Sequence, residues 1–196
     1  MTLDLSRRRL LAAGAAVVVA GACSNGGDAG GDGDGDLDFA AGAAGIERLA
    51  VDHFTGTGRL LTDGKLGALV PPALAALVAN AVGQHRQAHD AWNKVLTGAG
   101  RAEVTGSPAK AQEALNAAGL RVTDVLAAAT LALRLEDYAC QTYQRALPTL
   151  GRPETTTLAA QLNVVGQQRQ TVLRYLLGRN PLAGAGADPH LRLITG

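Results

Sequence analysis

The chain has 196 residues, a length typical of one domain, and a formal net charge of +1 that gives no sign of a nucleic-acid partner. Hydrophobic residues make up 47% of the chain but aromatic residues only 3%, so the apolar content is mostly Ala, Leu and Val, and an all-α fold is favoured over a β fold. The chain has two cysteines, and because a lipid is expected on Cys23, Cys140 has no partner for a disulfide within the chain.

The first residues have the pattern of an export signal. A basic start that includes Arg7 and Arg8 precedes an apolar run that is too short for a typical membrane span. Paired arginines followed by two leucines resemble a twin-arginine signal, which carries folded proteins across a bacterial membrane. Residues 19–23 resemble a lipobox, in which the cysteine is lipidated. We therefore predict a signal peptide over residues 1–22 and a lipid, such as palmitate, on Cys23; the alternative is an ordinary signal with an incidental cysteine.

Residues 23–38 are rich in Gly and Asp and alternate strictly between them over residues 31–36. Such a composition buries little apolar surface, so we predict a flexible tether between the lipid and the folded domain. Residues 23–196 carry a net charge of −1, which again gives no support for a nucleic-acid partner.

Helical spacing of apolar residues predicts four long helices after the tether. The proline pair at residues 71–72, single prolines, glycines and a capping aspartate indicate where they begin and end. The predicted helices cover about residues 39–61, 72–97, 123–147 and 154–178. The connection over residues 98–122 is long enough to hold a short helix near 108–118, and residues 179–196 form a tail. Two helices, a long crossover and two more helices predict a ferritin-like four-helix bundle over residues 39–178.

A six-residue phrase occurs twice, as VGQHRQ over residues 82–87 and as VGQQRQ over residues 165–170. Each copy falls in the second helix of a predicted helix pair. The repetition predicts that the two pairs are related halves of the bundle.

Three short segments resemble bacterial ferritin-like domain proteins. Leu135–Tyr143 resembles their third helix, Ile46–Leu49 their first, and Val172–Gly178 the end of their fourth. The resemblance covers about residues 38–181, and it implies the fold more strongly than an activity.

Metal-binding members of that fold use one Glu from each of two helices and a Glu-x-x-His pair from each of the other two. Glu47 and Glu136 match the two single glutamates. Where the pairs are expected, both copies of the repeated phrase place Gly and Arg instead. The resemblance therefore implies a degenerate di-metal site, because a guanidinium has no lone pair with which to bind a cation.

A buried carboxylate without a partner is costly, and the fork of an arginine suits a carboxylate. We predict that Arg86 and Arg169 neutralise Glu47 and Glu136 inside the bundle, with the pairing left open.

The histidines support an alternative in which a metal is bound. His85 and His89 lie one turn apart on the predicted core stripe, and His53 can face them. Together with Glu47 and Glu136, His85 and His89 could hold iron or manganese in an oxidase or storage protein. The helix that carries the second copy of the phrase supplies no histidine or carboxylate near this level.

A third hypothesis is a binding site for a small molecule. Gly83 and Gly166 remove side chains at the level of the expected metals, and the resulting cavity could hold an anion or a zwitterion. Cys140 lies at a core position, where a free cysteine acts as a small hydrophobe.

We expect a lipoprotein on the extracytoplasmic face of the membrane, with a binding or structural role, a possible protein partner in the envelope, and no enzymatic activity.

Overall fold

The computed structural model describes residues 32–67 and 69–181. Within these residues the chain forms five helices and no strand, so the all-α prediction is confirmed. The helices are α2 (Asp32–Thr62), α3 (Pro72–Gly98), α4 (Ala109–Gly119), α5 (Val125–Ala146) and α6 (Pro153–Leu176). The predicted signal peptide, with Arg7 and Arg8, and Cys23 lie outside the described residues, as does the tail from residue 182. In the described part of the chain, no helix combines the length and apolar character needed to cross a bilayer.

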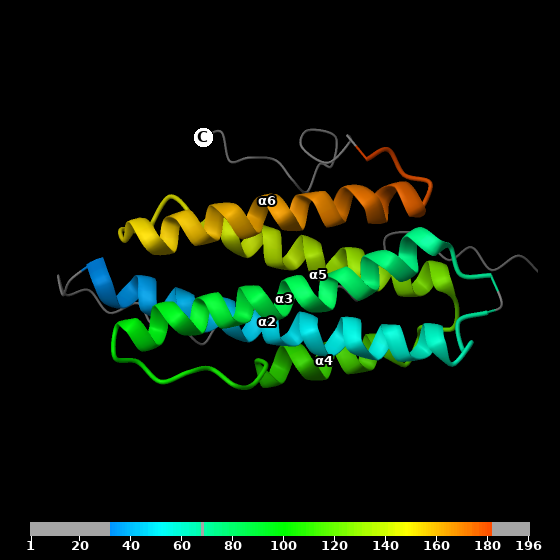
Figure 1. The fold of residues 1–196 in the computed structure, drawn as a ribbon, viewed down its shortest axis with the longest axis horizontal. Helices are drawn as coiled ribbons and strands as arrows, with labels where there is room; N and C mark the ends of the chain where they lie inside the picture. Colours follow the sequence, from blue (N-terminus) through cyan, green and yellow to red (C-terminus); the bar gives the residue numbers. More distant parts are fainter. Residues whose placement is uncertain (1–31, 68, 182–196) are drawn as a thin grey trace, which may run out of the picture.

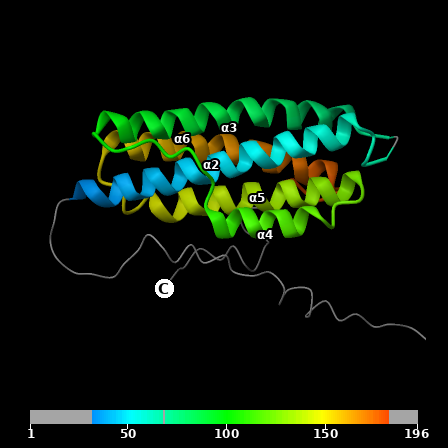
Figure 2. The same cartoon turned by 90° about the horizontal axis from the view of Figure 1, so that it is seen from below.

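The four longer helices lie side by side in a bundle (Figure 1). α2 packs against α3, α5 packs against α6, and contacts of α3 with α6 and of α2 with α5 join the two pairs. The chain between α3 and α5 returns along the bundle, so α3 and α5 run in the same direction (Figures 1 and 2). α4 belongs to this connection and packs against α2 and α5 through the buried Ala111.

The helix ends follow local signals in the sequence. Pro72 occupies the first turn of α3, where its missing N–H costs no hydrogen bond. The Asp124 carboxylate caps α5 by accepting a hydrogen bond of 2.8 Å from the Ala127 amide. Gly100 and Gly178, just beyond α3 and α6, have φ of 76° and 66°, a left-handed conformation that favours glycine.

The start of α2 differs from the sequence prediction. The helix begins at Asp32 rather than at residue 39, so residues 32–38, predicted as part of the tether, are helical. The physical reason is Asp36, whose carboxylate is buried and accepts hydrogen bonds from the amides of Gly151 and Arg152 at 3.1 and 2.8 Å. It also accepts one of 2.5 Å from the Thr155 hydroxyl. These donors lie at the start of α6, where amides lack partners within the helix.

The apolar core consists of two clusters, one toward each end of the bundle. The first includes Phe54, Leu74, Leu133 and Leu173. The second includes Leu37, Ile46, Trp92 and Tyr143. The two clusters meet at the level of Glu47 on α2, His85 on α3 and Glu136 on α5. Each of these three residues is at most 2% exposed. A polar layer therefore divides the core.

Candidate functional site

The polar layer centres on the imidazole of His85. Its Nδ1 lies 2.5 Å from Glu47 Oε2, and its Nε2 lies 3.1 Å from Glu136 Oε1. A neutral imidazole has only one donating nitrogen, whereas ionised carboxylates only accept. With both neighbouring carboxylates ionised, a hydrogen bond to each of them requires a proton on both nitrogens, so His85 is an imidazolium.

Three helices supply these groups. His85 continues the buried stripe of α3, four residues after Ala81 and three before Ala88. Its ring stacks on Phe54 of α2 with centroids 5.3 Å apart. Glu47 comes from α2 and Glu136 from α5, so the imidazolium ties α3 to one helix of each pair.

Arg169 of α6 completes the layer. Its Nε donates a hydrogen bond of 2.6 Å to Glu136 Oε1, and its Nη1 donates one of 2.9 Å to Gln84 Oε1. Its side chain is 11% exposed, so this residue connects the buried groups to the surface. We call Glu47, His85, Glu136 and Arg169 the charge cluster.

An aromatic pair extends the cluster into the second apolar region. The Tyr143 hydroxyl donates a hydrogen bond to Glu47 Oε1. The Trp92 indole N–H lies 3.3 Å from that hydroxyl, and the two rings stack with centroids 6.2 Å apart. Glu47 is therefore held by one neutral and one charged donor.

The charges of the cluster balance, since two carboxylates face one imidazolium and one guanidinium. Burial alone lowers the pKa of His85, but hydrogen bonds to Glu136 and Glu47 outweigh it and raise this pKa above 6.5. Burial alone raises the pKa of Glu136, but hydrogen bonding to His85 and the charges of His85 and Arg169 hold it below its ordinary value. The cluster stays neutral overall while its members are ionised.

The prediction that Arg86 neutralises one of the two buried glutamates is wrong. Arg169, in contrast, does contact Glu136. Arg86 is exposed and forms no ion pair or hydrogen bond within the described part of the chain. It follows His85 by one residue, which turns it about 100° around α3, away from the core. The second cation of the cluster is therefore His85.

His89 lies outside the cluster as well. Its Nε2 is 2.8 Å from the carbonyl oxygen of Val104, in the connection that follows α3. Asn93 binds the same segment, donating to the Val104 carbonyl at 3.0 Å and accepting from the Val104 amide at 2.8 Å. His89 and Asn93 thus fix the connection to α3, and His89 is not available as a partner of the buried carboxylates.

The two glycines of the repeated phrase have different surroundings. A Cβ added at Gly166 would lie 2.4 Å from the Cys140 sulfur, so that sulfur fills the space that the glycine leaves. Gly83 is exposed, and a Cβ there would meet no atom within 4 Å. The predicted internal cavity beside these glycines is therefore not formed. Burial raises the pKa of Cys140 to about 12, which argues against a reactive thiol.

His53 lies beside the layer, and burial lowers its pKa to about 4. Its Nε2 and Glu136 Oε2 are buried atoms without a hydrogen-bond partner. His53 is therefore neutral and adds no charge to the cluster.

The donor set does not fit the di-metal centre of ferritin-like metalloproteins. Both nitrogens of His85 are directed at carboxylates, and its ring lies between them. Arg169 places a guanidinium against Glu136 Oε1, and this cation repels a metal ion at the same carboxylate. Across residues 32–67 and 69–181, no three His, Cys, Asp or Glu side chains are grouped so as to hold a metal ion.

The fold and the site define an all-helical bundle whose centre is an internal ion cluster. A model of the ferritin-like domain family matches residues 64–179. The chain belongs to this ferritin-like family.

Among solved structures, a conserved hypothetical protein from Mycobacterium tuberculosis is similar to this chain with a TM-score of 0.59 and 20% identity. The alignment covers 76% of this chain and 94% of that one, and at this identity it supports the fold alone. No curated protein matches the chain.

Proposed function

We propose that this protein is a lipoprotein of the bacterial cell envelope, anchored through Cys23 to the extracytoplasmic face of the membrane. Its ferritin-like domain has a non-catalytic role, as a binding or structural module, and holds no resident metal. The finer architecture we propose is a four-helix bundle with a long crossover that contains α4.

One observation carries the non-catalytic proposal, namely the imidazole of His85 between Glu47 and Glu136. These are the two glutamates that match the family's single-glutamate ligands. The imidazolium and Arg169 supply the positive charge that would otherwise come from metal ions. Buried ion networks of this kind can enforce one packing arrangement without adding much net stability.

Metal analysis tests this proposal directly. The full chain, purified without chelators and then incubated with ferrous iron in air, is expected to retain well under one equivalent of iron and to show no ferroxidase activity. Arg169→His serves as a comparison with the unmodified chain. It places on α6 an imidazole, which is the ligand type that metal-binding members of the fold carry on this helix. Stoichiometric iron or manganese in the unmodified chain would contradict the proposal.

The competing proposal is an iron or manganese oxidase with a rearranged ligand set. The buried and unpartnered Glu136 Oε2 and His53 Nε2 favour it, because both atoms can bind a metal. The contacts of His89 with the connection after α3 count against it. The same metal analysis separates the two functions.

Anchoring is tested in a bacterium with twin-arginine export. The chain is expected in the membrane fraction, Cys23→Ala in the soluble exported fraction, and the Arg7→Lys/Arg8→Lys variant in the cytoplasm. Membrane association of Cys23→Ala equal to that of the unmodified chain would exclude the lipid anchor.

A further inference from the structure

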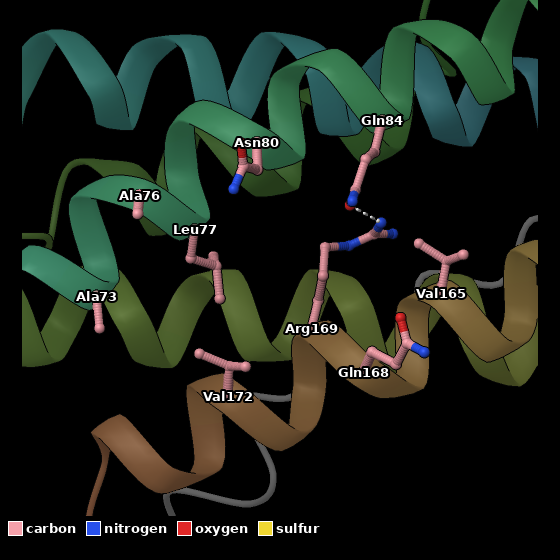
Figure 3. Close-up of a pocket in the computed structure, with 9 residues that line it drawn as sticks. All are labelled: Ala73, Ala76, Leu77, Asn80, Gln84, Val165, Gln168, Arg169 and Val172. Atoms are coloured by element: carbon pink, nitrogen blue, oxygen red, sulfur yellow. Dashed lines mark hydrogen bonds between the residues drawn. The ribbon is translucent and has the colours of Figure 1, made fainter.

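A surface groove runs between α3 and α6, outside the buried core, and encloses about 280 Å³ (Figure 3). Among the described residues, Arg169 is the only charged side chain in its lining, and it is already paired with the buried Glu136. The groove therefore combines a single cation with otherwise neutral walls.

One part of the groove is apolar. Ala73 and Ala76 are exposed on α3, Leu77 forms part of the base, and Val172 of α6 faces them (Figure 3). Val172 is 40% exposed although it is a large hydrophobic residue. The small alanines leave room above the surface for an apolar chain.

The other part is polar and holds Arg169 in place. Asn80, Gln84 and Gln168 contribute amides, and the Arg169 guanidinium lies beside the Gln84 amide (Figure 3). A guanidinium has five N–H donors. The Nε donor is used by Glu136 and one Nη1 donor by Gln84, so the remaining donors have no partner within the described residues. The cation is fixed before any ligand arrives, which reduces the entropy cost of binding.

We propose that this groove binds a small amphiphilic monocarboxylate, with the carboxylate on Arg169 and the apolar tail along Ala76 and Val172. The fork of a guanidinium suits a planar carboxylate. Because Glu136 already pairs with Arg169, the guanidinium donors that remain suit one carboxylate better than a phosphate dianion. The groove shares Arg169 with the charge cluster but otherwise lies outside the core, and it depends neither on lipid anchoring nor on the absence of metal.

The dimensions set the size of the ligand. Ala73 and Gln84 are eleven residues apart on α3, which corresponds to about 16 Å and leaves room for a tail of about six to eight carbons beyond the carboxylate. The volume lies just below the range of about 300–1,000 Å³ typical of sites for drug-sized molecules.

Amide NMR titration of the purified full chain with octanoate tests the proposal, with octylamine as a probe of the same tail and opposite charge. We expect octanoate to cause saturable shifts at Ala76, Val172 and Gln168, and octylamine to bind much more weakly. Ala76→Leu fills the apolar part and should weaken octanoate binding by about tenfold or more. Ala75→Leu is the matched control, because Ala75 is exposed on the same helix but does not line the groove.

A second variant tests the polar part without touching the core. Gln168→Glu places a negative charge beside Arg169 on an exposed position and should weaken octanoate binding several-fold. The proposal is overturned if octanoate gives no saturable shifts, if octylamine binds as tightly, or if Ala75→Leu weakens binding as much as Ala76→Leu. Retained octanoate binding in both Ala76→Leu and Gln168→Glu would likewise overturn it.

Discussion

Replacing His85 by glutamine is the most direct perturbation of the charge cluster. The change keeps a polar side chain but removes the imidazolium that lies between Glu47 and Glu136. The buried charges then no longer balance, since two carboxylates face only Arg169. Removing one partner of a buried ion pair typically costs about 3–5 kcal/mol, because the other charge stays buried without compensation.

This loss is a large fraction of the stability of a typical domain, about 5–15 kcal/mol. For a domain of this size, each kcal/mol lowers Tm by about 2–4 °C, so His85→Gln should lower Tm by roughly 6–20 °C. Thermal and urea unfolding at pH 6, followed by far-UV circular dichroism, measures the change. Arg86→Gln is the matched control on the neighbouring residue and should stay within about 0.5 kcal/mol, because Arg86 is exposed.

A double variant separates charge balance from packing. Glu47→Gln/His85→Gln removes one negative and one positive charge, and it leaves Glu136 paired with Arg169. The double variant should therefore lose less stability than the sum of the single variants, with a coupling energy of about 0.5–3 kcal/mol. The reasoning is refuted if the single losses simply add, or if Arg86→Gln costs as much as His85→Gln.

Three further predictions follow from the same contacts. Because the folded-state pKa of His85 is raised above 6.5, its contribution to stability is complete below that value and is lost as pH rises through the folded-state pKa. The free energy of unfolding should thus decline on the alkaline side of pH 6.5 in the unmodified chain, and this part of the decline should vanish in His85→Gln. Gly166→Ala should destabilise the fold by about 1–3 kcal/mol through overlap with the Cys140 sulfur. Gly83→Ala should be neutral or stabilise by up to about 1 kcal/mol; equal effects at the two glycines in urea unfolding would contradict this assignment. In a Cys23→Ser variant, Cys140 should resist a disulfide reagent at pH 8 in the folded state and react once urea unfolds the chain, since its pKa is about 12.

Helix positions were predictable where the signals are local. Pro72, Asp124 and Pro153 each act on the turn in which they lie, so the predicted starts of α3, α5 and α6 agree closely with the structure. The start of α2 is different, because Asp36 is helical and buried through hydrogen bonds to the residues just before α6, more than a hundred residues away. No local pattern in a Gly-Asp run signals that contact.

The repeated phrase explains the error in the cluster. The two copies turn different residues toward the core. In α3 the buried residue of the phrase is His85, whereas in α6 the buried residues are Gly166 and Gln170. The flanking residues contained the signal, because counting four from Ala81 reaches His85 rather than Arg86. A similar phrase in two helices therefore does not place the same residue types at the buried positions.

The two halves of the bundle supply the same charge by different chemistry. α6 contributes a guanidinium, which stays protonated at any physiological pH, while α3 contributes an imidazolium whose proton depends on its two carboxylate neighbours. If His85 lost its proton, one of the two carboxylate contacts would lose its donor and the cluster would carry a net negative charge. Arg169 would then be the only cation for both glutamates, although it contacts Glu136 alone. The charge balance of the centre therefore depends on the proton of His85, which is the cation of the layer that can titrate.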